Sequence, residues 1–127
     1  MRLRINIPSR VFLEAEADKV SARSPAGGFT LLPRHIDLAT VIAPGILSYA
    51  QGGQEHFAAV AEGILVKLGD EVLVSVRAAA SGELGELREA VHRMVEDVDE
   101  HEQAARSAVT RLEASFVRRF LEIGRRG

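Results

Sequence analysis

The 127-residue chain has no cysteine, only one tyrosine and five phenylalanines, and a net charge of −2. The lack of cysteine excludes disulfide bonds, thiolate metal sites and a cysteine nucleophile, and it fits a reducing compartment. Nucleic acid is a poor candidate partner, because surfaces that bind it are basic and often stack bases on aromatic rings. No stretch approaches the roughly 20 apolar residues that cross a bilayer, and the N-terminus lacks the apolar core of a secretory leader. We therefore expect no direct membrane insertion.

Glycine and proline are unevenly distributed, and the change comes near Ser81 and Gly82. Before this point the hydrophobic pattern has a period of two and is interrupted by turn residues. Beyond it the period is helical, and glycine and proline almost vanish. The sequence therefore predicts two domains, a β-sandwich over residues 1–82 and a helical domain over residues 83–127.

Two segments of the first part show a clear period of two, as expected for strands with one buried face. Leu3, Ile5 and Ile7 alternate within the first strand, and a second strand is expected over residues 71–77. Between them, turn residues recur at short intervals, at positions 27–28, 44–45, 51–54, 62–63 and 68–71. Such spacing favours an antiparallel sandwich or barrel over alternating strands and helices.

The second part carries an apolar stripe at helical spacing: Leu84, Leu87, Val91, Met94, Val98, Ala105, Ala108, Leu112, Phe116, Phe120 and Ile123. A stripe of this kind normally packs against the rest of the protein or against another helix. We expect a helical hairpin, with its turn between Glu96 and Glu102. One continuous helix remains the alternative, because no glycine or proline lies between Glu86 and Ile123.

Charge reverses along this helical part. Acidic residues dominate from Glu83 to Glu102, and basic residues dominate from Gln103 onward, namely Arg106, Arg111, Arg118, Arg119, Arg125 and Arg126. A hairpin would place the two arms side by side, whereas an opened tail would offer its basic arm to an acidic partner. The plainer interpretation is that both are ordinary solvated helix faces, where single ion pairs contribute little.

Catalytic and metal-binding patterns are absent from the sequence. The histidines at positions 35, 56, 92 and 101 do not have the spacing of a metal site on a helix, and no serine has the context of a nucleophile elbow. The glycine pairs do not open a helix as phosphate-binding loops do. A carboxylate pair acting as acid and base stays open, but the acidic residues cluster on the helical arm. We predict a non-catalytic protein without metal or cofactor.

Two blocks of sequence resemble a known family. The run GGFTLLPRHIDLATVIAPGIL, residues 27–47, is similar to the pattern G-x-x-G-x-x-P-x-H-x-P, an apolar stretch and K-P-G of the epsilon subunit of F-type ATP synthases. The run FAAVAEGILVKLGDEVLVSVRAAA, residues 57–80, resembles the family's F-x-V-x-G-G-F-L-E-V and the strand after it. A sandwich followed by helices matches the family's whole architecture.

The resemblance implies a rotor subunit at the cytoplasmic face of the bacterial inner membrane, peripheral to it. In the family the sandwich docks on the gamma subunit and on the polar loops of the membrane rotor ring. The residues that this resemblance points to as ring-facing are Phe29, Pro33, Arg34 and His35. Arg34 and Asp37 would act as substitute contacts, with charges that differ from the common form. Pro33 stiffens the loop and so lowers the entropy lost on docking. For His35, the alternative is a loop histidine that is hydrogen-bonded only for the stability of the sandwich.

The tail is expected to regulate. When extended, its basic arm would reach acidic segments of the catalytic beta subunits and impede rotation in the direction of ATP hydrolysis. Some bacterial members bind ATP through an I/L-D-x-x-R-A motif. The run over residues 84–89 keeps Leu84 and Arg88 of that motif but loses its Asp and Ala, so we predict weak or no ATP binding.

Several positions depart from the family's pattern. The second proline of the first block is Asp37, the glycine before His35 is Arg34, and the paired glycine of the second block is Glu62-Gly63. These departures resemble the divergent, alternate ATPase type that some bacteria encode as a second enzyme. The alternative functions are an adaptor or scaffold that binds unrelated proteins and an independent ligand-binding sandwich, for which no polar pocket residues are evident.

Overall fold

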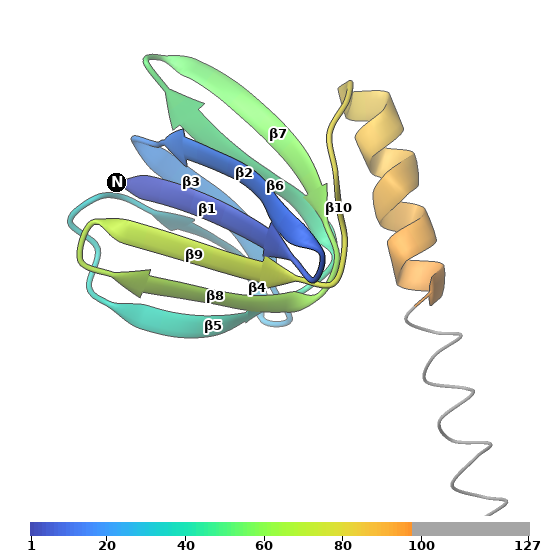
Figure 1. Cartoon of the computed structure of the whole chain (residues 1–127), viewed down its shortest axis with the longest axis horizontal. Helices are drawn as coiled ribbons and strands as arrows, with labels where there is room; N and C mark the ends of the chain where they lie inside the picture. The colour runs from blue at the N-terminus through green and yellow to red at the C-terminus, as the bar shows by residue number, and fades with distance from the viewer. Residues whose placement is uncertain (98–127) are drawn as a thin grey trace, which may run out of the picture. The chain divides into compact units, whose positions relative to one another are not determined.

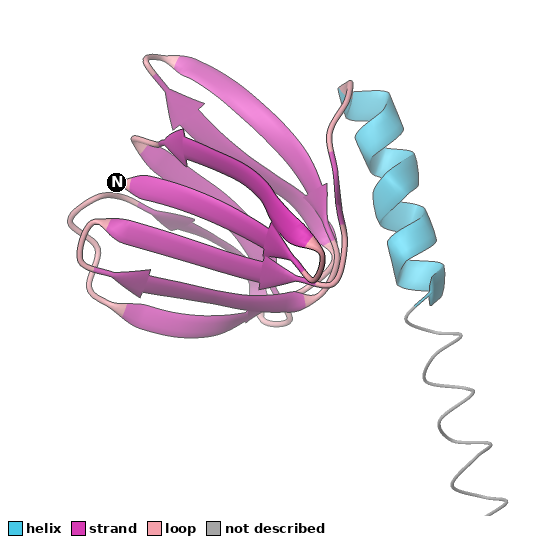
Figure 2. Cartoon of the chain, in the orientation of Figure 1, coloured by secondary structure: helices cyan, strands magenta, loops and turns pink. Residues whose placement is uncertain are grey.

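The computed structural model of the chain describes residues 1–97. Two five-stranded sheets pack face to face, and a helix follows them over residues 84–97 (Figure 1; Figure 2). The predicted class, a β-sandwich followed by helical structure, is confirmed. Residues 98–127 lie outside the described part, so the choice between a helical hairpin and one continuous helix stays a prediction.

The first sheet contains, in spatial order, β2 (Arg10–Glu16), β1 (Arg2–Ile7), β9 (Glu71–Val76), β8 (Gly63–Leu68) and β5 (Leu38–Ile42). The second contains β10 (Ala79–Ala80), β7 (Gln54–Val60), β6 (Gly45–Gln51), β3 (Lys19–Ser24) and β4 (Gly27–Leu31). Neighbouring strands are antiparallel except for β1 and β9, which pair in parallel. Only hairpin partners must be antiparallel, and these two strands are separated by most of the chain.

The core lies between the sheets and follows the period of two seen in the sequence. Leu3 and Ile5 of β1 are fully buried beside Val72 and Val74 of β9, their partners in register. Residues between them, such as Arg4, face solvent. Burial of each large aliphatic side chain contributes about 1.5–3 kcal/mol, so this alternation is a main source of the sandwich's stability.

Residues Met1–Val95 form one compact unit, which includes most of the helix over 84–97. On this helix Leu87 and Met94 are buried against Ala59 and Ala61, while Ile46 packs at the margin of the same cluster. Leu87 and Met94 are both part of the predicted helical stripe. Within residues 1–97, no helix is long and apolar enough to cross a membrane.

Candidate functional site

The loop over residues 32–37 joins β4 of the second sheet to β5 of the first. It lies at the same end of the sandwich as the β8–β9 turn (Figure 1). All of its residues are exposed, including Pro33 and Arg34. The loop therefore brings together four of the five residues that the sequence singled out here, Pro33, Arg34, His35 and Asp37.

Phe29, the fifth, is placed differently. It belongs to β4, and its half-buried ring packs against the main core. Its register partner on β3 is Ala22, which is itself buried in that core. Much of the Phe29 ring therefore serves the interior of the sandwich, while the loop that follows carries the exposed positions.

Lys67 of β8 is the buried charged residue of the described chain, with only 1% of its surface exposed. It shares the core-facing side of β8 with Leu65, and its ammonium group reaches the end of the sandwich. There Nζ donates hydrogen bonds to the His35 carbonyl at 2.6 Å and the Gly69 carbonyl at 2.7 Å. One buried side chain thus ties the β4–β5 loop to the β8–β9 turn.

Asp37 makes a second connection between the same two segments. Its Oδ1 accepts a hydrogen bond from the Gly69 N–H at 2.7 Å. Gly69 has a φ of +57°, a left-handed conformation that glycine adopts at little cost. Asp37 stands where the family's pattern has a second proline. In this chain the hydrogen bond from Gly69 to Asp37 restrains the loop backbone, as the proline ring would at that position.

His35 makes local contacts. Its N–H donates to the Leu32 carbonyl at 2.9 Å, which closes a turn around Pro33, and its Nδ1 lies 2.9 Å from the Ile36 carbonyl. The side chain remains exposed. A hydrogen-bonded loop histidine and an exposed contact residue are therefore compatible descriptions of the same side chain.

Large apolar side chains project from this end of the molecule. Ile36 is 78% exposed and Leu68 is 63% exposed, and Leu32 is exposed as well. We call Leu32, Ile36 and Leu68 the end surface. Sequence reasoning missed both this surface and Lys67. The available signal was a lysine at a core-facing position, two residues after Leu65, in an otherwise apolar strand.

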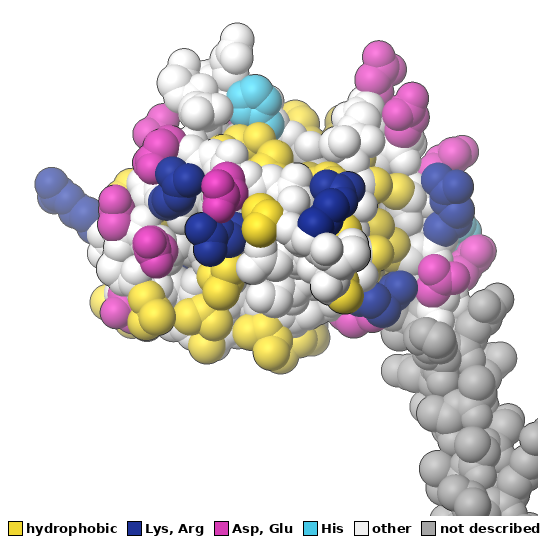
Figure 3. Space-filling view, in the orientation of Figure 1, with side chains coloured by type: hydrophobic (Ala, Val, Ile, Leu, Met, Phe, Trp, Pro, Cys, Tyr) yellow, Lys and Arg dark blue, Asp and Glu magenta, His cyan; other side chains and the backbone are white. Residues whose placement is uncertain are grey.

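The outer side of the first sheet is divided into an apolar and a charged half. Register places Val41 beside Ile64 and Val66 beside Leu73, across β5, β8 and β9. With Ala39, these residues form what we call the outer apolar face. Figure 3 shows hydrophobic side chains gathered toward the β8 and β5 side, and several Lys, Arg, Asp and Glu side chains on the part of the sheet away from them. Large exposed apolar patches bordered by polar residues commonly mark interaction sites, so this face is a candidate.

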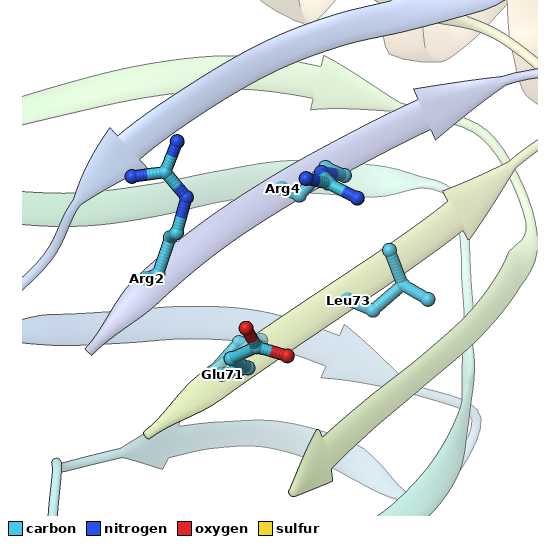
Figure 4. Close-up of a pocket in the computed structure, with 5 residues that line it drawn as sticks. Arg2, Arg4, Glu71 and Leu73 are labelled. Carbon is cyan, nitrogen blue, oxygen red and sulfur yellow. The ribbon is translucent and has the colours of Figure 1, made fainter.

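The charged half lies over β1 and β2. Arg2 and Arg4 donate to Glu14 at 3.2 and 2.8 Å. Beside them a hollow of about 90 Å³ is lined by Arg2, Arg4 and Leu73, together with Glu71 and Val72 (Figure 4). It is smaller than sites that hold organic ligands, and both guanidinium groups are already paired. The hollow is therefore a poor candidate for a ligand site.

Arg77 connects the sandwich to the helix. It follows β9, and its guanidinium donates to the carboxylate of Glu62 and to the Met94 carbonyl, the latter at 3.4 Å. Together with the burial of Leu87 and Met94, this contact attaches the helix over residues 84–97 to the β6–β7 side of the second sheet.

The remaining predicted site residues lie on or beyond this helix. Leu84 and Arg88, which match part of the ATP motif, are both exposed, and Arg88 borders an open depression with Glu89 and His92. Weak or absent ATP binding stays a prediction. Within residues 1–97, no group of three or more potential metal ligands comes together. The basic residues Arg106, Arg111, Arg118, Arg119, Arg125 and Arg126 lie outside the described residues.

Known proteins resemble the chain in sequence. ATP synthase epsilon chain 2 of Cereibacter sphaeroides is 37% identical over 122 residues, which cover 93% of this chain and 84% of the relative. ATP synthase epsilon chain 2 of Paraburkholderia xenovorans is 34% identical, with 95% and 90% covered. The epsilon chain of Anaeromyxobacter sp. is 32% identical, with 90% and 93% covered. Two of these three relatives are thus second epsilon chains of their organisms by name.

Solved structures share the fold. A chain of the Euglena gracilis mitochondrial ATP synthase, in an OSCP/F1/c-ring structure, superposes with a TM-score of 0.59 at 20% identity, over 72% of this chain and 61% of that one. A chain of the central stalk/c-ring structure from Tetrahymena thermophila gives 0.55 at 10% identity, over 77% and 95%.

A family model agrees with both comparisons. Residues 1–82 match the model of the ATP synthase delta/epsilon chain, β-sandwich domain. This range equals the first predicted domain, although the boundary between two domains stays a prediction. The match covers the strands, the β4–β5 loop and the β8–β9 turn described above. The chain belongs to the ATP synthase delta/epsilon family, among the epsilon chains.

Proposed function

We propose that this chain is a non-catalytic docking subunit of the central stalk, at the cytoplasmic face of the membrane. In this proposal the outer apolar face binds the gamma subunit, and the end surface with Arg34 and His35 binds the loops of the rotor ring. The adaptor hypothesis would use the same surfaces with unrelated partners. Family membership favours the rotor.

The observation that carries the proposal is the form of the β4–β5 loop. It is exposed, held by Lys67 and Asp37, and bears the apolar side chain of Ile36, which is 78% exposed. Exposure of a large apolar side chain on a loop that is fixed in place suits contact with a partner. A preformed loop binds with a smaller loss of conformational entropy, which suits a part that must transmit torque without yielding.

The tail is proposed to inhibit ATP hydrolysis through its basic arm. Leu87 and Met94 are the buried side chains by which the described helix docks, and much of the surface beneath them is alanine. A small interface of this kind separates two states by a small free energy, as a switch requires. The reversal of charge beyond Gln103 supports contact with an acidic partner.

The test is ATP hydrolysis by the cognate catalytic head with gamma, reconstituted with three versions of the subunit. These are the full chain, a chain ending at Val95, and a full chain carrying Arg118→Glu and Arg119→Glu. Ending at Val95 keeps the compact unit Met1–Val95 together with the Leu87 and Met94 contacts, so that only residues 96–127, which carry the basic arm, are removed. Co-purification with gamma is measured in parallel.

We expect all three versions to bind gamma and only the full wild-type chain to suppress hydrolysis. Binding by all without suppression by any would reject the inhibitory tail and leave a structural coupling subunit. If none bound gamma, the rotor assignment itself would fail, and the adaptor hypothesis would replace it.

A further inference from the structure

The side chain of Lys67 is buried at a cost. An ammonium group taken out of water loses hydration free energy, and a residue such as methionine would fill the same volume without that loss. Lys67 is nevertheless 1% exposed, on the core-facing side of β8. Packing alone therefore does not explain a lysine at this position.

The hydrogen bonds of Lys67 offer an explanation. Its two acceptors belong to different segments, the His35 carbonyl in the β4–β5 loop and the Gly69 carbonyl in the β8–β9 turn. Asp37 joins the same two segments by a separate hydrogen bond. Here the side chain of the loop residue is the acceptor, and the backbone N–H of Gly69 in the turn is the donor. We call these three hydrogen bonds the clamp. By contrast, the bond from the His35 N–H to the Leu32 carbonyl closes a turn within the loop and attaches it to nothing else.

The two most exposed large apolar residues of the described chain, Ile36 and Leu68, are each flanked on both sides by residues of the clamp. Ile36 lies between His35 and Asp37, both of which are clamped. Leu68 lies between Lys67 and Gly69, which are clamped as well. Directly after the loop, Leu38 pairs with Lys67 in the β5–β8 ladder, so the exit of the loop is also anchored. The backbone positions of Ile36 and Leu68 are thus set before any partner arrives.

We propose that Lys67 and Asp37 are positioning residues, which hold Ile36 and Leu68 as a preformed apolar contact for a partner loop, on the same loop that carries the exposed residue Arg34. The contact suits a loop with an apolar side chain next to an acidic one. That this loop belongs to the rotor ring rests on the proposed function. The positioning itself does not, and it is measured on the free protein.

The first experiment compares the wild type with Lys67→Met, Asp37→Ala and Asp37→Asn by amide hydrogen exchange and NMR of residues 32–37 and 68–70. Asp37→Ala removes the acceptor of the Gly69 N–H, so exchange at Gly69 should accelerate about tenfold or more. Asp37→Asn keeps a side-chain oxygen as acceptor and should retain most of the protection. Lys67→Met should broaden or shift the loop resonances, while the melting temperature stays near that of the wild type because the core remains filled.

The second experiment measures binding of the same variants to the cognate rotor, gamma with its ring, prepared without this subunit. Lys67→Met and Asp37→Ala should weaken binding about tenfold with the sandwich intact, since loop ordering must then occur on docking. Asp37→Asn should bind within about twofold of the wild type, because its side-chain oxygen can still accept the hydrogen bond from the Gly69 N–H, which the alanine variant loses.

Unchanged loop resonances in Lys67→Met, together with unchanged Gly69 exchange in Asp37→Ala, would overturn the clamp. A loosened loop with wild-type affinity would overturn its role in binding. Failure of the wild type to bind the rotor, with the exchange results as expected, would reject the proposed function while the clamp stands.

Discussion

At Gly63, the first residue of β8, the backbone of β9 leaves no room for a side chain. A Cβ atom placed there would collide with the Ser75 carbonyl oxygen and come within 2.8 Å of the Val76 Cα. The family's pattern has two glycines at this point, and this chain keeps only the second. The first position is Glu62, whose carboxylate is paired with Arg77. Steric necessity thus explains which glycine is present.

Gly63→Ala should therefore destabilise the sandwich by about 3 kcal/mol or more, because the obstructing atoms are backbone and cannot swing away. The measurement is the free energy of unfolding from denaturant titration. Gly28→Ala is the matched control, since its new Cβ would meet nothing nearer than the Ala22 carbonyl oxygen at 3.9 Å. Equal stability of the two variants would contradict the steric explanation.

Among the elements, the helix over residues 84–97 packs through a small buried cluster of its own. Leu87 and Met94 are its buried side chains, and they meet Ala59 of β7 and Ala61, which directly follows that strand. Arg77 adds a hydrogen bond to the Met94 carbonyl. The main core between the sheets contains none of these residues, so the helix and the sandwich need not unfold together.

Leu87→Ala should release the helix without unfolding the sandwich. Removal of a buried leucine costs about 2–5 kcal/mol, and Leu87 is one of only two helix side chains that are buried within the described residues. Amide exchange should accelerate over residues 84–97 while β1 and β9 remain protected. Val95→Ala, at an exposed position of the same helix, should leave both regions unchanged. Loss of protection in both regions of Leu87→Ala would mean that helix and sandwich form one cooperative unit.

Taken as a whole, the described part of the molecule presents two apolar surfaces to water. One is the end surface around Ile36, and the other is the outer apolar face over β5, β8 and β9. Both are assembled from strands or loops that are distant in sequence. Each is bordered by polar groups, as interaction sites commonly are.

The outer apolar face predicts a selective binding defect. Ile64→Asn should weaken binding of gamma about tenfold or more and change the stability of the free chain little, because Ile64 is 54% exposed. Val11→Asn is the control, because Val11 is similarly exposed, at 48%, on the distant edge strand of the same sheet. The measurement is the affinity for purified gamma. Equal affinities of the two variants would place the gamma contact elsewhere.

Local patterns in the sequence were sufficient for the sandwich and for the position of the loop. Leu3 and Ile5 alternate with polar neighbours because a strand exposes one face, and this needs no knowledge of the partner strand. The start of the helix after Gly82 was equally predictable, because the change from a period of two to a helical period depends only on neighbouring residues. The motif around Pro33 and His35 located an exposed loop correctly, although Phe29 proved to be partly a core residue.

The chain's own alternation, turn residues and two family blocks thus determined its class, its family and the segment to examine. Only the tertiary structure decided what holds that segment. The acceptors of Lys67 include His35, which is 32 positions away, and the outer apolar face exists only because β5, β8 and β9 pair in one register. Periodicity records which way a side chain points, whereas contacts between distant segments depend on the pairing of strands, which no local pattern specifies.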